Sequence, residues 1–159
     1  MQSDTLEHRI QSLEDKAALK ALVDAFSNLA DQKDNATQAL LFTEDAVVDT
    51  YVEGQLFASL KGRKEIEDTF TGFMATFETS YHINGQHTAE LDGNRATAVH
   101  YCLVVLISTV DGKRTRSTNG VRYKDEYVRQ GDRWLISKRT SHFTWRDQQA
   151  IGQSQATTA

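Results

Sequence analysis

The side chains best suited to move protons in this 159-residue chain are its five histidines. An imidazole has an unperturbed pKa of about 6.5, so it can take up or give a proton near neutral pH. A carboxylate that accepts the N–H of one ring nitrogen would fix the tautomer and leave the other nitrogen free as a base. His82 and His100 lie on predicted strands, where each could instead be a structural residue. His8, His87 and His142 carry weaker functional signals.

Metal and thiol chemistry have little support in the sequence. His82 and His87 are five residues apart, and on a regular strand that spacing predicts opposite faces, so no metal site is expected. Cys102 is the only cysteine, which excludes an internal disulfide and a cysteine-based zinc site. Gly62-Arg63-Lys64 begins a predicted helix but lacks the spacing of a nucleotide-binding loop. We therefore expect no metal and no organic cofactor.

Composition and charge restrict the class of protein further. The chain is 39% hydrophobic and 25% charged, as in ordinary globular proteins, and its formal net charge is −4, which argues against bulk binding to nucleic acid. The longest apolar run, Cys102 to Ile107, is too short to span a membrane, and the first residues show no secretory signal. We expect a cytoplasmic protein with one domain, residues 1–150, and a disordered tail, residues 151–159.

Helical periodicity marks the first part of the chain. Apolar residues recur at three- and four-residue steps over residues 4–33 and predict a long amphipathic helix, which Asp4 or Thr5 could cap. A short helix is expected over residues 36–42. A third helix begins at Lys61-Gly62-Arg63. Its apolar positions share one face and are Ile66, Phe70, Phe73, Met74 and Phe77.

The rest of the chain has the pattern of strands separated by tight turns. Two short strands are predicted over residues 46–51 and 55–60. Turn signals that contain Asp and Gly then separate four long strands, at residues 80–91, 95–110, 113–129 and 133–145. Helices followed by a curved antiparallel sheet define the α+β class.

Both faces of the strand over residues 96–108 are largely apolar. Neither face should then contact water, and three helices can cover only one of them. We therefore expect a homodimer that forms through the sheet.

Several stretches resemble the SnoaL-like branch of the nuclear transport factor 2-like superfamily, over roughly residues 5–146. They are Leu41 to Val47, Gly62 to Ile66, His82 to Gln86, and Tyr123 to Ile136. The resemblance implies a cone-shaped α+β barrel of the cystatin-like type, in which three N-terminal helices pack on a curved, mainly antiparallel sheet around an apolar pocket. This fold hosts dehydratases, isomerases and non-catalytic members, so the fold alone does not fix the activity.

The resemblance also points to particular residues. Scytalone dehydratase, the bile-acid 7-alpha dehydratase and the hexachlorocyclohexane dehydrochlorinase use an aspartate at the end of the first helix and a histidine at the start of a later strand. Asp31 and His82 lie at those positions, and Arg139 resembles the dehydrochlorinase arginine, although it could belong to a surface charge pair. The chain departs from the pattern at Phe26, where two of these enzymes have Lys or Tyr. It departs again near Val104, where the bile-acid enzyme has Asp.

These positions lead to a functional hypothesis. Asp31 and His82 would form a general base, and the chain would be a cofactor-independent lyase or isomerase of a small, hydrophobic, cyclic substrate. The predicted substrate-binding residues are Phe26, Tyr51, His100 and Arg139. The alternatives to Tyr51 are Tyr81, Tyr101, Tyr123 and Tyr127. Asp31 could instead be a solvated residue in the polar run 31–35. The alternatives are a non-catalytic module that binds small molecules or partners, and an assembly subunit similar to dioxygenase β subunits.

Overall fold

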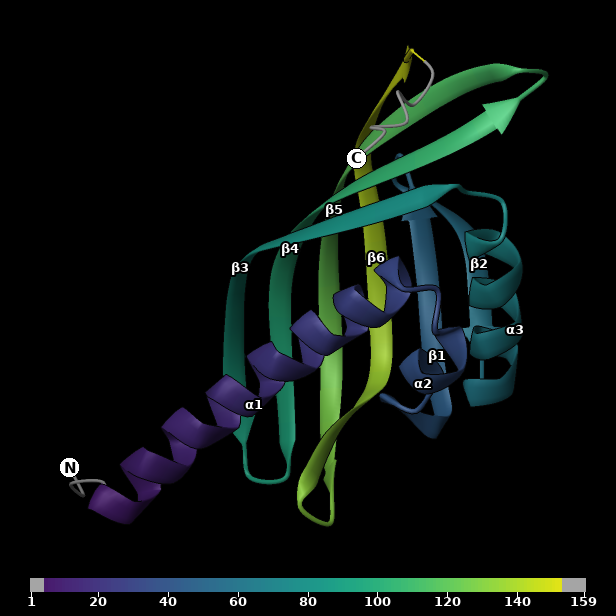
Figure 1. Cartoon of the computed structure of the whole chain (residues 1–159). Helices are drawn as coiled ribbons and strands as arrows, with labels where there is room; N and C mark the ends of the chain where they lie inside the picture. Colours follow the sequence, from purple (N-terminus) through teal and green to yellow (C-terminus); the bar gives the residue numbers. More distant parts are fainter. Residues whose placement is uncertain (1–4, 153–159) are drawn as a thin grey trace, which may run out of the picture.

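The computed structural model describes residues 5–152 and places three helices on one side of a six-stranded sheet (Figure 1). In chain order the elements are α1 (Leu6–Asp31), α2 (Asn35–Ala39), β1 (Phe42–Val52), β2 (Gln55–Lys61), α3 (Arg63–Met74), β3 (Thr79–Asp92), β4 (Arg95–Val110), β5 (Lys113–Gln130) and β6 (Arg133–Ala150). The predicted α+β class is confirmed. The side of the sheet that faces the helices is called the inner face below, and the other side the outer face.

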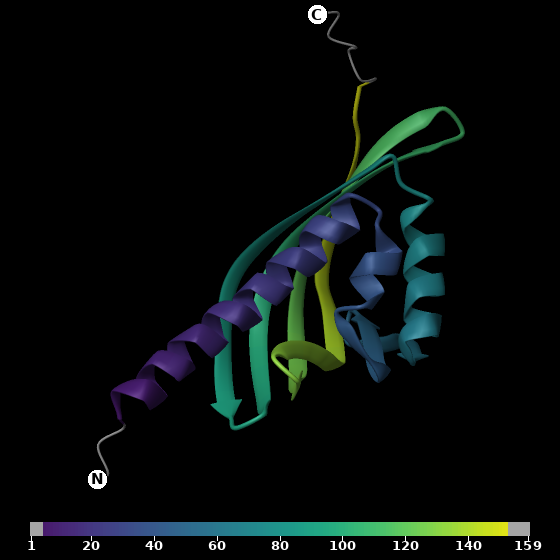
Figure 2. The same cartoon turned by 60° about the horizontal axis from the view of Figure 1, so that its bottom comes forward.

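The long helix α1 crosses the inner face diagonally and extends beyond it at the N-terminal end (Figure 2). Thr5 caps it, because the Thr5 hydroxyl oxygen accepts a hydrogen bond from the backbone N–H of His8 at 3.3 Å. The sequence periodicity predicts one apolar stripe along the whole helix, but Leu6, Ile10 and Leu13 are 66%, 47% and 69% exposed. The helix is longer than the sheet that it crosses, so only its C-terminal half is packed in the core.

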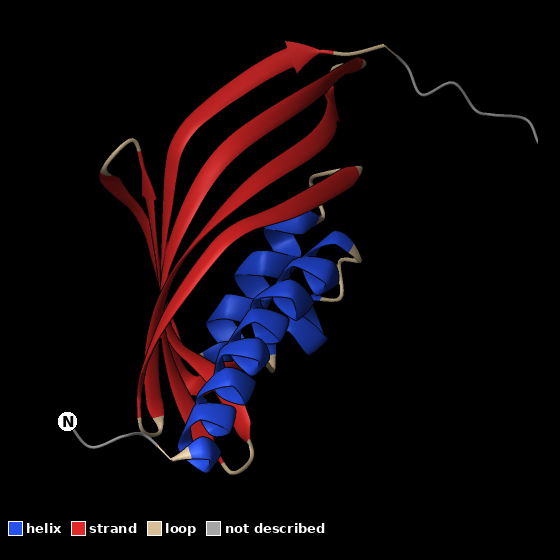
Figure 3. Cartoon of the chain, turned by 90° about the vertical axis from the view of Figure 1, so that its left-hand side faces the viewer, coloured by secondary structure: helices blue, strands red, loops and turns tan. Residues whose placement is uncertain are grey.

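The strands follow the order β2-β1-β6-β5-β4-β3. Strands β3 to β6 form the predicted antiparallel meander, whereas β1 pairs with β6 in parallel, a long-range contact that no turn signal announces. The sheet is curved and unclosed, with the helices on its concave side (Figure 3). No helix in residues 5–152 is long and apolar enough to cross a membrane. Most of the predicted tail lies outside the described residues.

Strand β3 contains a bulge that sequence periodicity could not locate. Asn84 pairs with Cys102 of β4, but the next inner-face pair is His87 with His100, so β3 has one residue more than β4 over this interval. The extra residue returns His87 to the face of His82. The prediction that His82 and His87 lie on opposite faces is therefore wrong.

Two apolar clusters fill the space between the helices and the sheet. The larger one lies under α1, β1 and α3 and includes Phe26, Phe42 and Ile66. The smaller one consists of inner-face side chains of β4 and β5 and is called the inner patch: Cys102, Val104, Leu106, Val121 and Tyr123, with Phe77 and Phe143 packed against it.

Candidate active site

Asp31 and His82, far apart in the sequence, are in direct contact in the folded chain. Asp31 is the last residue of α1 and His82 is the fourth residue of β3. The Asp31 Oδ1 atom lies 2.6 Å from His82 Nδ1, and Asp31 Oδ2 accepts the backbone N–H of His82 at 3.0 Å. The hydroxyl of Ser80 also donates to Asp31 Oδ1, at 2.8 Å. Both carboxylate oxygens are therefore used to hold β3 and the imidazole in place.

Hydrogen bonds keep Asp31 ionised although the side chain is partly buried. Burial acts to raise the pKa of Asp31, but hydrogen bonds from the ring and backbone of His82, and from Ser80, outweigh it and hold that pKa below its usual value. A carboxylate at a helix C-terminus also faces the negative end of the helix dipole, and α1 has no basic residue in its last turn. The contacts with β3 therefore offset the unfavourable interaction between Asp31 and the dipole of α1.

The imidazole of His82 presents one free nitrogen. An ionised carboxylate can only accept, so Nδ1 carries the proton in the contact with Asp31, and Nε2 is left with its lone pair. The side chain of His82 is 8% exposed. Its Nε2 atom is not one of the fully buried polar atoms of residues 5–152 that lack a hydrogen-bond partner. On β4 the pairing partner of His82 is Val104, which belongs to the inner patch. This arrangement can accept a proton from carbon in an apolar setting.

A buried ion pair lies at the other end of the inner patch. Arg139 is 1% exposed, and its Nε and Nη2 atoms donate to the two oxygens of Asp125 at 2.8 and 2.7 Å. The hydroxyl of Tyr127 donates to Asp125 at 2.8 Å. Burial acts to raise the pKa of Asp125, but the adjacent guanidinium outweighs it and keeps that pKa below its usual range. Arg139 is thus buried and is not part of a surface charge pair. The interior, which was expected to be apolar, contains an ion pair.

Arg139 and its neighbours also form a stack of flat groups. The guanidinium carbon lies 4.1 Å from the ring centre of Phe26 and 4.6 Å from that of Tyr123. His100 stacks on Tyr123 with ring centres 4.6 Å apart. Phe26 packs edge-on against Phe42, with ring centres 6.0 Å apart, so it is a core residue under the guanidinium.

Three buried polar atoms around this stack have no hydrogen-bond partner among the described residues: His87 Nε2, His100 Nδ1 and Arg139 Nη1. Each belongs to an inner-face residue, on β3, β4 and β6 respectively. Leaving a buried polar atom unpaired costs about 1–3 kcal/mol, so such atoms are usually satisfied by water or a ligand. The inner face is therefore polar enough to contact a substrate that carries polar atoms. No group of three or more His, Cys, Asp or Glu side chains in residues 5–152 is placed to hold a metal ion.

Tyr51 does not face the interior. It pairs with His142 of β6, and the two rings stack with centres 5.1 Å apart. The charged groups of Asp49 and Lys138 lie 3.7 Å apart on this side of β1 and β6. Val48 and Arg139, by contrast, are register partners on the inner face. The prediction that Tyr51 points into the pocket is wrong, because its position in the strand alternation places it on the outer face.

The two hollows described below lie in the surface of residues 5–152, and neither contains Asp31 or His82. One, of about 350 Å³, lies near the turn between β3 and β4. The other, of about 490 Å³, lies on the outer face between β3 and β6. The enclosed pocket expected at Asp31 and His82 therefore stays a prediction.

Sequence reasoning missed Asp125, although a signal for it was present. Alternate residues of β5 from Val121 to Tyr127 are large and apolar, with Asp125 as the one carboxylate among them. A carboxylate in an apolar alternation predicts a buried anion that needs a cationic partner. Arg139 is that partner, but only the strand register reveals it.

Stability is expected to fall as the pH drops from about 6.5 toward 3, because His100 resists protonation. Burial and the charge of Arg139 lower the pKa of His100 to about 3, although Asp125 acts in the opposite direction. An unfolded histidine takes up a proton near pH 6.5, so the folded state loses about 1.4 kcal/mol for each pH unit below that value. Between about pH 7 and about pH 5, urea unfolding should lose about 2 kcal/mol through this residue.

His100→Gln should remove most of that pH dependence. His8 is exposed on α1, so His8→Gln provides a matched loss of a histidine and should retain the wild-type dependence. Identical pH profiles for His100→Gln and the wild-type chain would contradict this account of His100.

Comparison with known proteins assigns the chain to a family. A SnoaL-like domain matches residues 11–140, so the chain belongs to the SnoaL-like domain family. The uncharacterised protein Rv2910c of Mycobacterium tuberculosis is 23% identical over 131 residues, which cover 82% of this chain and 86% of that protein.

Solved structures support the same assignment. An NTF2-like protein with a cystatin-like fold from Novosphingobium aromaticivorans is 26% identical, with a TM-score of 0.68, over 88% of this chain and 90% of that one. A hexachlorocyclohexane dehydrochlorinase (LinA) Type2 has a TM-score of 0.78 at 16% identity, over 94% of this chain and 99% of that one. The second likeness shows the fold alone.

Proposed function

We propose that this chain is a cofactor-independent lyase or isomerase in which Asp31 and His82 act as a general base on a small, hydrophobic, cyclic substrate. The observation that carries the proposal is the 2.6 Å contact between Asp31 Oδ1 and His82 Nδ1, on a strand position that pairs with Val104 of the inner patch. The similarity in fold to a dehydrochlorinase, which eliminates, supports the same reaction class.

The chemistry follows from this geometry. His82 Nε2 takes a proton from a substrate carbon, and Asp31 stabilises the imidazolium that forms. The electron pair of the broken C–H bond becomes a carbon–carbon π bond. In an elimination a leaving group departs from the neighbouring carbon with its own bonding pair. In an isomerisation the pair of an existing carbon–carbon double bond moves one position along, and the carbon that receives it takes the proton back from the imidazolium. Neither course requires an external oxidant or reductant.

Proton exchange tests the proposal without knowledge of the natural substrate. The protein would be incubated in deuterium oxide with cyclic ketones and enones such as cyclohexenone and tetralone, and loss of the exchangeable C–H signals would be followed by proton NMR. Exchange faster than in protein-free buffer is expected for a suitable ring. An absence of acceleration across the panel would count against a base and favour the non-catalytic binding module.

We also propose that a second copy of the chain covers the outer face. The 490 Å³ hollow there has Gly85 and Gly120 in its lining, and the exposed rings of Tyr101 and Trp145 border it. A Cβ atom at Gly120 would lie 2.0 Å from the Trp145 indole, so only glycine lets that ring lie flat on the sheet. Large exposed apolar patches of this kind are typical of protein interfaces.

Light scattering coupled to size exclusion should therefore give the mass of two chains. Tyr101→Asp should shift the mass toward one chain, because it places a charge on the apolar outer face. Thr71→Asp adds the same charge at an exposed position of α3, on the side of the sheet that the helices cover. This variant should leave the mass unchanged. A single-chain mass for the wild-type protein at all concentrations would refute the dimer.

A further inference from the structure

The N-terminal half of α1 has an apolar stripe of its own, which faces away from the sheet. This stripe is called the seam, and its members are Leu6, Ile10, Leu13 and Ala17, all of them exposed. Each lies nine residues before a buried side chain of the same helix, in turn Asp15, Leu19, Leu22 and Phe26. Nine residues are two and a half turns of an α-helix, so the seam and the buried residues lie on opposite sides of α1. The seam is therefore not a continuation of the core.

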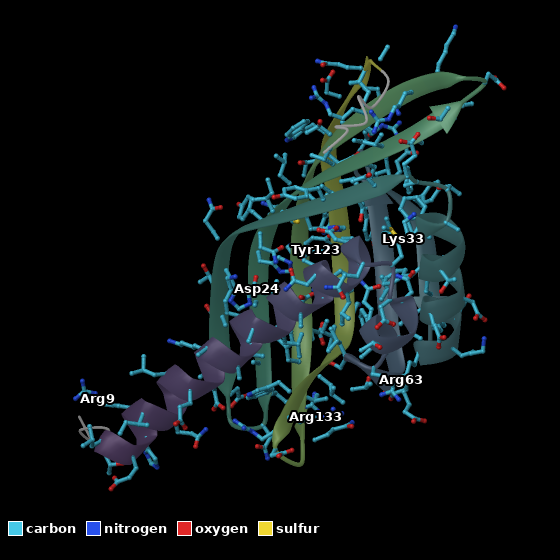
Figure 4. The ribbon with its side chains drawn as sticks, viewed as in Figure 1. Arg9, Asp24, Lys33, Arg63, Tyr123 and Arg133 are labelled. Carbon is cyan, nitrogen blue, oxygen red and sulfur yellow. The ribbon has the colours of Figure 1, made fainter. Side chains whose placement is uncertain are left out.

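The rotation of α1 about its own axis is fixed, so the seam has a fixed direction. On the side toward the sheet, Asp15 accepts a hydrogen bond from Trp134 Nε1 of β6 at 3.2 Å. The part of α1 before Asp15 extends beyond the sheet (Figure 2), and Figure 4 labels Arg9 on this projecting part. Aligned and exposed aliphatic side chains on a helix are typical of a surface that another helix covers.

The spacing of the seam is that of a coiled coil. Its residues follow one another at steps of four, three and four, which is the a/d alternation of the seven-residue repeat. In that repeat Leu6 and Leu13 occupy d positions, and Ile10 and Ala17 occupy a positions. A β-branched residue at a with leucine at d favours two parallel helices. The spacing thus points to one partner helix that runs in the same direction.

The charges beside the seam identify that helix. Arg9 and Lys16 occupy g positions on one flank, and Glu7 and Glu14 occupy e positions on the other. In a parallel pair of identical helices a g residue faces the e residue five positions later in the partner, so Arg9 would face Glu14 of a second copy. In an antiparallel pair the flanks would meet like with like, and the charges would repel. The segment is therefore complementary to itself in the parallel orientation.

We propose that the seam binds the seam of a second copy of this chain, in parallel and in register. Each seam faces away from its own sheet, so the two sheets lie on the outside of the helix pair and do not collide. The helix is already folded in the single chain, so pairing requires no helix formation. The contact is separate from the outer face and does not rest on the proposed function. It is also short, at two heptads, so pairing belongs to high protein concentrations and not to the dilution of size exclusion.

Disulfide trapping of the whole protein at high concentration tests the pairing. Leu13→Cys places a thiol in the seam, where position 13 of one copy would face position 13 of the other. Glutathione disulfide is the oxidant, and it is reduced to two molecules of glutathione as the two protein thiols join. The native Cys102 is buried and should not react.

His8→Cys is the matched control. His8 is exposed on the same part of α1, but it lies nine residues before Ala17 and is therefore opposite the seam. Electrophoresis without reductant should show at least about fivefold more cross-linked dimer for Leu13→Cys than for His8→Cys. Equal yields from the two variants would overturn the proposal.

Charge reversal tests the parallel orientation. Arg9→Glu, added to Leu13→Cys, should lower the yield, because position 9 would then face Glu14 of the other copy with the same sign. Further addition of Glu14→Arg should restore the yield, because the two charges are then opposite again. A yield that rises with Arg9→Glu alone would show an antiparallel pair and would overturn the proposal.

Tyr101→Asp separates the seam from the proposed contact at the outer face. Tyr101 is 44% exposed on that face, so its substitution should leave the yield of Leu13→Cys unchanged. Loss of the cross-link with Tyr101→Asp would mean that the outer face brings the chains together, and it would refute the seam. Retention of the cross-link would support the seam even if the wild-type protein had the mass of one chain in size exclusion.

Discussion

His82→Ala is expected to slow proton exchange on a responsive cyclic ketone by about a hundredfold or more, because it removes the atom that takes the proton. His82 Nε2 is the free nitrogen of the contact with Asp31, and within residues 5–152 no second imidazole is hydrogen-bonded to that carboxylate. The measurement is the initial rate of C–H signal loss in deuterium oxide. Circular dichroism and the midpoint of thermal unfolding would show that the variant is folded.

Asp31→Asn separates orientation from proton transfer. The amide nitrogen of Asn donates where the carboxylate accepts, so His82 would carry its proton on Nε2 and lose the free lone pair there. We expect a loss comparable to that of His82→Ala with the fold retained. His142→Ala is the matched control, because His142 stacks on Tyr51 on the outer face. If Asp31→Asn or His82→Ala left the exchange rate unchanged, the substituted residue would have no part in the mechanism.

Local signals in the sequence were sufficient for most of the fold. The turn at Asp111-Gly112 is an example: both residues have positive φ, 51° and 74°, as a tight hairpin turn requires, and Asp-Gly is the dipeptide that tolerates it. Strand patterns and turn signals likewise predicted the four long strands β3 to β6. These features depend on neighbours within a few residues, so the sequence displays them directly.

The features that could not be predicted depend on register between distant strands. The bulge between Asn84 and His87 changes the face of every later residue of β3, and nothing in its composition marks it. Tyr51 was misplaced for the related reason that β1 pairs with β6 in parallel, which fixes its face only once the sheet is assembled. The contact of Asp31 with His82 came from resemblance, because helix periodicity places Asp31 outside the apolar stripe.

Removal of one partner from the buried Asp125–Arg139 pair is expected to destabilise the protein by about 3–5 kcal/mol. Asp125→Leu leaves the guanidinium of Arg139 buried without an anion, and Arg139→Met leaves the carboxylate with Tyr127 as its remaining donor. Urea unfolding at neutral pH, followed by circular dichroism, gives the change in the free energy of unfolding. Such a loss is a large part of the stability of an ordinary domain, so the variants should also express poorly.

The double variant Asp125→Leu/Arg139→Met distinguishes an unpaired charge from lost packing. When both charges are absent, no buried ion is left without a partner, so the double variant should be more stable than either single variant. The partly exposed outer-face pair of Lys138 and Asp49, 3.7 Å apart, is the matched control, and Asp49→Asn should cost no more than about 1 kcal/mol. Additive losses in the double variant would mean that shape, rather than charge, determines the cost. In that case Arg139 would be retained chiefly as the flat group that separates Phe26 from Tyr123.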